Sequence, residues 1–182
     1  LIGENFGRSE LYSGMSQSET TVRLALATLK DREEWAVRLA PDAPTFAADQ
    51  LHQWIWGAAA QFWNAGQHAV AVEYGAKSLT AHIQQKSGSP LADRELAVET
   101  FSPKPSTKNA RLWLPGDQNT DAWKSRQDGL HHLAMGAFAG IRNVVTHSLE
   151  PGWSEQEALE YLAVLSTVAR WTDETVVVPP TP

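Results

Sequence analysis

The sequence predicts an all-α protein, built as a bundle of four main helices with an N-terminal helix and one excursion over the surface. Apolar residues recur at helical spacing in four long segments, and no segment alternates apolar and polar residues as a half-buried strand does. The 182 residues are enough for one domain with its own core. We expect an N-terminal extension with one or two helices over 1–45, the helical domain over 46–174 and a C-terminal tail over 175–182.

The N-terminal extension contains the first helical pattern. From Ser18 to Leu39 apolar residues recur at roughly helical spacing among many charges, and Pro41 and Pro44 end the pattern. The apolar positions are Val22, Leu26, Leu29, Ala36 and Leu39. This spacing predicts one helix or two short ones.

The first main helix is predicted from Phe46 to Ala65. Its core face repeats at i, i+3, i+4, i+7 and i+11, at Leu51, Trp54, Ile55, Ala58 and Phe62. Trp56 and Trp63 form a second apolar stripe, which a peripheral helix of a monomer does not need. We therefore expect Trp56 and Trp63 at an interface between copies of the chain, and the alternative is a platform on which nucleic-acid bases stack.

The second main helix is predicted from Gln67 to Ser87. Gly66 separates it from the first, so the two should form an antiparallel hairpin. A short helix is predicted from Leu91 to Thr100. Residues 102–116 contain three prolines and several polar residues, and this composition predicts an excursion over the surface.

The third and fourth main helices follow the excursion. The third is capped at Asn119, Thr120 or Asp121, and its apolar face consists of Leu130, Leu133, Ala137, Phe138 and Ile141. It also contains Gly136, Ala139 and Gly140. Because each glycine lowers helix stability by about 1 kcal/mol relative to alanine, we expect another backbone to approach there. The fourth begins with a capping box at Ser154 and Glu157 and runs to about Trp171.

Composition excludes several classes of site. The chain has no cysteine, so it has no disulfide, thiol nucleophile or thiolate metal site. Histidine spacings typical of zinc sites are missing, and we expect neither a metal nor another cofactor. The absence of cysteine fits a reducing cytoplasm, so we expect a cytoplasmic protein, and because no apolar run reaches the length of a membrane span we expect no membrane partner. The net charge of −6 argues against general nucleic-acid binding, although residues 51–149 hold nine Lys and Arg against seven Asp and Glu.

Arg142, Asn143 and His147 form the strongest candidate site, at the close of the third main helix. Arginine presents a permanently charged planar fork to phosphate oxygens, and asparagine adds a neutral donor and acceptor. Histidine titrates near neutrality, as a general acid or base must. The three residue types can hold a phosphate and move a proton without a metal. We therefore take Arg142, Asn143 and His147 as candidate catalytic residues.

Arg142 also has a purely structural interpretation, and a second pair of residues shows the same spacing. Arg142 can instead pair with a carboxylate inside the bundle, such as Glu73 or Glu160. The same Arg-x4-His spacing recurs at Arg126 and His131. His131 lies about 16 Å along a continuous helix from Arg142, too far for one centre within a subunit, so His131 and His132 either line a partner's cleft or have ordinary surface and capping roles.

The chain resembles a known family at these residues. Arg142-Asn143 followed by four residues to His147, between the third and fourth main helices, looks like the Arg-x4-6-His signature of the HEPN superfamily. Residues 46–172 look like the Ymh-type hypothetical proteins of prokaryotes. Further similar segments are the 54–86 hairpin, Phe101-Ser102, Gly136-Ala137, Ile141, Thr146 and Ala158 to Leu162. Val144 stands where that group often has proline, which changes the expected turn.

The resemblance implies a HEPN-like helical domain that dimerises, with the motifs of two subunits facing one cleft. Many HEPN proteins are metal-independent endoribonucleases in toxin, phage-defence and CRISPR systems, and others are noncatalytic nucleotide-binding or interaction modules. The leading hypothesis is RNA cleavage by a homodimer, in which His147 transfers a proton, Arg142 stabilises phosphate charge and Asn143 orients the reacting groups. The alternative is a noncatalytic binding or dimerisation module, and an antitoxin or another protein domain is a candidate partner.

Overall fold

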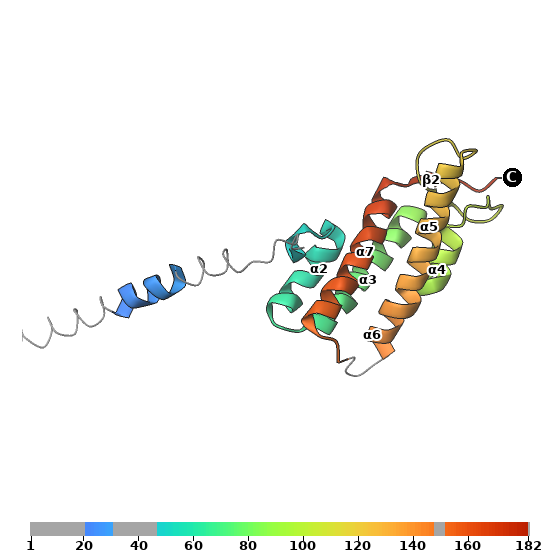
Figure 1. The fold of residues 1–182 in the computed structure, drawn as a ribbon. Helices are drawn as coiled ribbons and strands as arrows, with labels where there is room; N and C mark the ends of the chain where they lie inside the picture. Colours follow the sequence, from blue (N-terminus) through green and yellow to red (C-terminus); the bar gives the residue numbers. More distant parts are fainter. Residues whose placement is uncertain (1–20, 31–46, 148–151, 182) are drawn as a thin grey trace, which may run out of the picture. The chain divides into compact units, whose positions relative to one another are not determined.

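A computed structural model describes residues 21–30, 47–147 and 152–181. The chain divides into two compact units, Leu1–Thr45 and Phe46–Pro182. In the first unit, residues 21–30 form a helix (Figure 1), within the segment predicted to be helical. Pro41, Pro44 and the remainder of that predicted segment lie outside the described residues. No helix of the described residues combines the length and the apolar character needed to cross a membrane.

The second unit begins with the predicted helical hairpin. The short turn η1 (Ala48–Gln50) leads into α2 (Gln53–Asn64), which packs along α3 (His68–Ser87). Gly66 has a φ of +73°, in the left-handed region that favours glycine, and this allows the tight turn between the helices. The predicted core face is largely confirmed: Leu51 and Ile55 are buried, and Trp54, Ala58 and Phe62 are half-buried.

Three further helices complete the bundle: α4 (Asp93–Thr100), α5 (Asp121–Ala137) and α7 (Glu155–Glu174). Thr120 caps α5 by accepting a hydrogen bond from the Trp123 N–H at 3.2 Å. The predicted capping box of α7 is confirmed, because the Ser154 N–H donates to Glu157 Oε2 at 2.9 Å and the Glu157 N–H donates to Ser154 Oγ at 3.2 Å.

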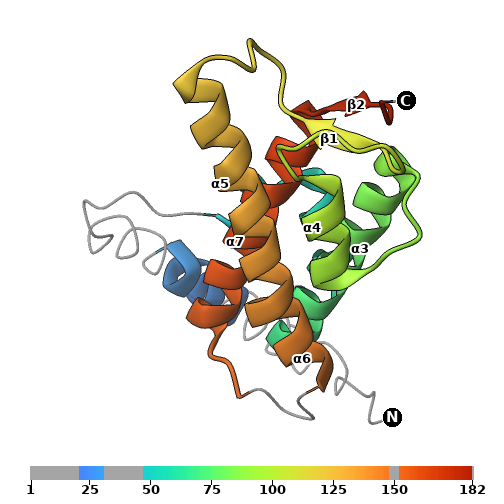
Figure 2. The ribbon, with the colours of Figure 1, turned by 90° about the vertical axis from the view of Figure 1, so that its right-hand side faces the viewer.

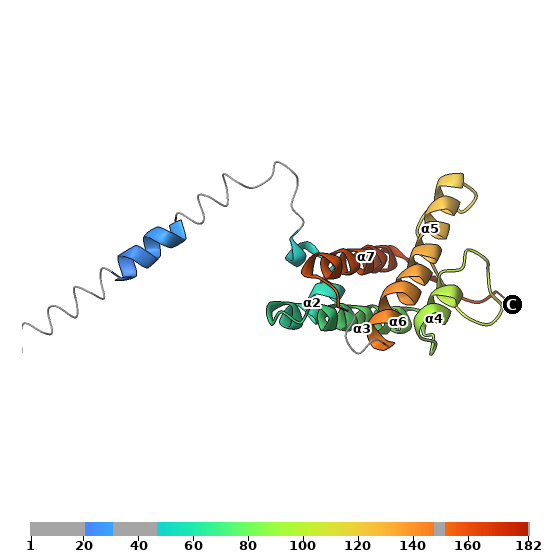
Figure 3. The ribbon, with the colours of Figure 1, turned by 60° about the horizontal axis from the view of Figure 1, so that its bottom comes forward.

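The helices bury one continuous apolar core. Helix α7 packs against α2, α3 and α5, while α4 packs between α3 and α5. In Figure 3, α7 runs beside the hairpin and α5 runs across it. The largest fully buried apolar side chains come from all these segments: Ile55, Val72, Leu79, Ile83, Leu96, Phe101, Leu112, Leu130, Phe138, Leu162 and Leu165. The prediction of an all-α bundle is confirmed.

A small sheet is the main departure from the predicted fold. Strand β1 (Arg111–Trp113) pairs antiparallel with β2 (Val176–Val178), and Leu112 lies opposite Val177. The sequence predicts no strand, a surface excursion at 102–116 and a tail at 175–182. The strands were missed because each has three residues, and β1 is buried throughout and does not alternate.

The excursion is anchored in the core by one buried amide. The Gln127 side chain is fully buried on α5, and its Nε2 donates to Phe101 O at 2.9 Å and to Leu112 O at 3.2 Å. Its Oε1 accepts from the Leu114 N–H at 2.9 Å. The Trp123 indole N–H also donates to Leu114 O at 2.8 Å. The segment predicted to lie on the surface is therefore partly a core element.

Trp56 and Trp63 make part of their contacts within the chain. Both indoles are half-buried against the core, and their rings meet edge-on with centroids 6.4 Å apart. Trp63 also contacts His68, with ring centroids 4.6 Å apart. The predicted role of Trp56 and Trp63 between two copies of the chain stays a prediction.

Candidate functional site

The backbone that carries the candidate site is a helix with a change of pitch. Helix α5 continues into a π-helical turn, η2 (Phe138–Arg142), and then into α6 (Asn143–His147). The Asn143 N–H donates to Phe138 O, so this turn holds one residue more than an α-helical turn. Residues after the turn therefore point to a different side of the helix from the one that regular spacing predicts. Because of this turn, His131 and Arg142 do not lie on one regular α-helix, which the expected separation of about 16 Å assumed.

Arg142 is held by a carboxylate on a different helix. Its Nη1 donates to Asp93 Oδ2 at 2.7 Å and to Asn143 Oδ1 at 3.3 Å. The Arg142 side chain is 21% exposed and that of Asp93 is 29% exposed, so the ion pair is half-buried. Asn143 thus lies beside the guanidinium, as the candidate site requires. His147 ends α6 one helical turn after Asn143, and its side chain lies outside the described part of the chain.

The carboxylate partner differs from those proposed from sequence. Glu73 pairs with Lys77 on its own helix at 2.7 Å, and Glu160 accepts from Gln156 Nε2 at 2.9 Å. Asp93 is the partner because α4 packs against η2, which places the first residue of α4 beside Arg142. Glu73 and Glu160 were therefore wrong as partners, although the expectation that Arg142 pairs with a carboxylate is confirmed.

Asp93 has an unusual local environment. Its φ of +55° is the only positive value at a non-glycine residue in the described ranges, and aspartate tolerates this region better than most residues. Such backbone strain costs on the order of 1–3 kcal/mol. Its Oδ1 is buried and has no hydrogen-bond partner among the described residues. The preceding residue, Ala92, is the N-cap of α4 and supplies no side-chain hydrogen bond. The Asp93 carboxylate accepts from Arg142 and from no backbone N–H of the described residues, so helix capping does not explain it.

The predicted small-residue face consists of Gly136, Ala139 and Gly140, and it precedes Arg142 on the same continuous helix. All three residues are exposed. A Cβ added at Gly136 or Gly140 would meet no atom within 4 Å. The close backbone approach that we expected is therefore not made within the described part of this chain. Figure 2 shows α5 on the near side of the second unit, with no other helix of that unit in front of it.

The second Arg-x4-His pair does not assemble a comparable site. Arg126 forms an exposed ion pair with Glu174 on α7. His131 is half-buried, its Nε2 has no hydrogen-bond partner among the described residues, and burial lowers its pKa, with the neighbouring His132 adding to the shift. His132 is exposed and its Nδ1 lies 2.8 Å from Asp128 O. This pattern favours ordinary surface and packing roles for all three residues.

A second polar cluster, at the start of α2, was missed by the sequence analysis. His52 is the N-cap of α2, where its Nδ1 accepts from the Trp54 N–H at 3.4 Å. Its Nε2 lies 3.7 Å from Asp173 Oδ2, and Trp54 stacks on His82 with ring centroids 4.3 Å apart. Burial lowers the pKa of His52, against the opposing charge of Asp173. The signal that could have found it is a histidine directly before an apolar helical stripe.

Lys86 completes this cluster at the end of α7. Its Nζ donates to Thr172 O at 2.8 Å and to Asp173 O at 2.7 Å. A lysine bonded to the last carbonyls of a helix satisfies groups that have no partner within that helix. The cluster thus caps two helix ends, and each of its polar contacts has a structural explanation.

Within the described ranges, no group of three or more histidine, aspartate or glutamate residues could hold a metal ion.

Residues 49–172 match a family described as "Protein of unknown function (Hypoth_ymh)". The match includes Asp93, Arg142, Asn143 and His147. No curated protein and no solved structure matches the chain.

Proposed function

We propose that this chain, which belongs to the Hypoth_ymh family, is a metal-independent endoribonuclease of the HEPN type that acts as a homodimer. The observation that carries the proposal is the half-buried Arg142 beside Asn143, with His147 one turn later on the same helix. A toxin or phage-defence system, with an antitoxin or another protein domain as partner, fits an endoribonuclease of this type.

The proposed chemistry is transesterification within RNA. The 2′-oxygen attacks the neighbouring phosphorus as its proton passes to one histidine, the P–O5′ bond breaks, and a second histidine protonates the departing 5′-oxygen. The products are a 2′,3′-cyclic phosphate and a 5′-hydroxyl. Arg142 stabilises the charge that develops on the phosphate, and Asn143 orients the phosphate or the imidazole. Two copies of His147 allow one to act as base while the other acts as acid.

The small-residue face supports a dimer through α5 and η2. Each glycine within a helix lowers stability by about 1 kcal/mol relative to alanine. Because an added Cβ at Gly136 or Gly140 would meet no described atom within 4 Å, packing inside the described bundle does not account for that loss. If a second copy crosses this helix at Gly136 and Gly140, the Arg142 residues of the two copies lie near each other, since Gly140 is two residues from Arg142.

The dimer is tested by sedimentation velocity on three leucine variants. Gly136→Leu and Gly140→Leu place a large side chain on the small-residue face and are expected to give monomers. Gly57→Leu is the matched control, because Gly57 is an exposed helical glycine on α2 with nothing within 4 Å of an added Cβ. If only Gly57→Leu gives monomers, the dimer interface lies on α2, where Trp56 and Trp63 are, and not on α5 and η2.

Catalysis is tested by incubating the protein with labelled single-stranded RNA in EDTA. The wild type should cleave and leave 2′,3′-cyclic phosphate ends, whereas Arg142→Ala and His147→Ala should be inactive while folded. Arg126→Ala and His132→Ala are controls, since they remove an arginine and a histidine from exposed positions of α5. Cleavage that survives either motif variant would remove that residue from the mechanism.

The second candidate function is a noncatalytic nucleotide-binding or dimerisation module. The net charge of −6 favours it, because a net negative charge lowers affinity for a long polyanion. This function predicts nucleotide binding that depends on Arg142, measured by calorimetry, with no RNA product. A folded wild-type dimer that binds nucleotide and leaves all RNA intact would replace the ribonuclease proposal with this one.

A further inference from the structure

We infer that Asp93 is a positioning residue, which fixes the guanidinium of Arg142 in the orientation that receives a phosphate oxygen. The inference rests on the proposed function, because it assigns Asp93 a part in phosphate recognition by Arg142. Asp93 acts through Arg142 and is not expected to touch the substrate, since its Oδ2 is engaged with Nη1 and its Oδ1 is buried.

The contact geometry supports this role. A guanidinium carries five N–H donors in a rigid planar fork, so a bond to one nitrogen orients the whole group. Asp93 Oδ2 and Asn143 Oδ1 both accept from Nη1, at 2.7 Å and 3.3 Å. The two acceptors come from different helices, α4 and α6, and together they restrict rotation of the guanidinium.

The unfavourable features of Asp93 also support it. The residue combines a φ of +55° with a buried Oδ1 that no described residue bonds. Backbone strain and unsatisfied buried polar atoms concentrate at functional sites, where the surrounding fold maintains them. Ala92, the neighbouring N-cap, forms no side-chain cap. The first turn of α4 therefore presents a carboxylate to Arg142 instead of using it to cap its own helix.

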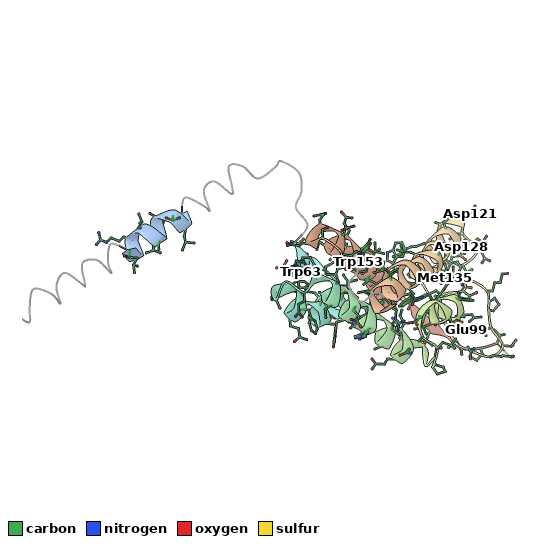
Figure 4. All side chains as sticks on the ribbon, turned by 90° about the horizontal axis from the view of Figure 1, so that it is seen from below. Trp63, Glu99, Asp121, Asp128, Met135 and Trp153 are labelled. Atoms are coloured by element: carbon green, nitrogen blue, oxygen red, sulfur yellow. The ribbon has the colours of Figure 1, made fainter. Side chains whose placement is uncertain are left out.

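The ion pair between Arg111 and Glu99 shows what a structural pair in this fold looks like. Arg111 is 10% exposed, and its Nη1 lies 2.7 Å from Glu99 Oε1. Its guanidinium also donates to the carbonyl oxygens of Lys104 and Glu99, and Asn109 Nδ2 donates to Glu99 Oε1. This pair ties the excursion to α4, where Figure 4 marks Glu99. Glu99 is the matched control for Asp93.

The test compares Asp93→Asn, Asp93→Gly and Glu99→Gln in the full chain. Asparagine tolerates a positive φ and removes only the charge, while glycine removes the carboxylate and relieves the backbone. The first readout is the nitrogen-15 NMR signal of the Arg142 side chain, assigned with Arg142→Lys and titrated with inorganic phosphate. The second readout is the kcat and KM of RNA cleavage, and thermal melting monitors folding.

We expect faster guanidinium rotation and weaker phosphate binding in both Asp93 variants. We also expect kcat to fall about tenfold or more in both, because the charge-assisted hydrogen bond that orients Arg142 is lost. Glu99→Gln should lower the melting temperature and leave kcat and the Arg142 signal close to wild type. Wild-type phosphate binding and kcat in the Asp93 variants, an equal fall in Glu99→Gln, or loss of folding in both Asp93 variants would overturn the inference.

The outcome is separable from that of the proposed function. If the wild type cleaves no RNA but phosphate shifts its Arg142 signal, and the Asp93 variants weaken that shift, the ribonuclease proposal fails while the role of Asp93 stands. If the wild type cleaves RNA and the Asp93 variants cleave it equally well, the proposed function stands and the role of Asp93 fails.

Discussion

Replacement of Gln127 by leucine should destabilise the bundle more than any other single amide substitution in the described residues. The Gln127 side chain is fully buried, and it satisfies Phe101 O, Leu112 O and the Leu114 N–H. Gln127→Leu leaves these three backbone groups without the partner they now have. Each buried polar group without a partner costs roughly 1–3 kcal/mol, and burial of the leucine returns about 2 kcal/mol. With each of the three groups costing about 2 kcal/mol, the expected loss in the free energy of unfolding is roughly 4 kcal/mol.

The assay is urea denaturation followed by circular dichroism, at one fixed protein concentration because a dimer's stability depends on it. Gln84→Leu is the matched control: Gln84 also lies on a helix, and its Nε2 donates one exposed hydrogen bond to Leu91 O at 2.7 Å. We expect the control to change the free energy of unfolding by less than about 0.5 kcal/mol. A loss below about 1 kcal/mol for Gln127→Leu would refute the argument that this amide anchors the excursion.

Two further predictions concern pH and helix capping. Because burial lowers the pKa of His52 in the folded state, the unfolded chain binds more protons, and the free energy of unfolding should fall as the pH is lowered from about 7.5 to about 5.5. His52→Asn keeps an N-cap acceptor and should weaken this dependence in urea titrations at several pH values; an unchanged slope would exclude His52 as its source. Ser154→Ala removes the capping box of α7 and should lower the free energy of unfolding by about 1 kcal/mol in urea denaturation. Ser125→Ala, at an exposed position within α5, is the control and should leave stability unchanged. Equal effects of the two substitutions would argue against the cap.

The sequence by itself determined the elements whose signals are local. Apolar spacing along α2 and α3 with Gly66 between them predicts the hairpin, and the capping box predicts the start of α7, because these signals lie within a few residues of one another. The residues of the candidate site could also be chosen from the sequence, since Arg142, Asn143 and His147 lie within six positions of one another. These features depend on helical periodicity and side-chain chemistry alone.

The tertiary structure alone decided the contacts between distant segments. Asp93 pairs with Arg142 across 49 positions, and β1 pairs with β2 from the far end of the chain. In sequence, Asp93 looks like an ordinary acid at the start of a short helix, no different in kind from Glu73 or Glu160. Which carboxylate reaches Arg142 depends on how α4 packs against η2, and the π-helical turn sets the direction of that arginine. Such contacts follow from the packing of a whole core, which no local pattern encodes.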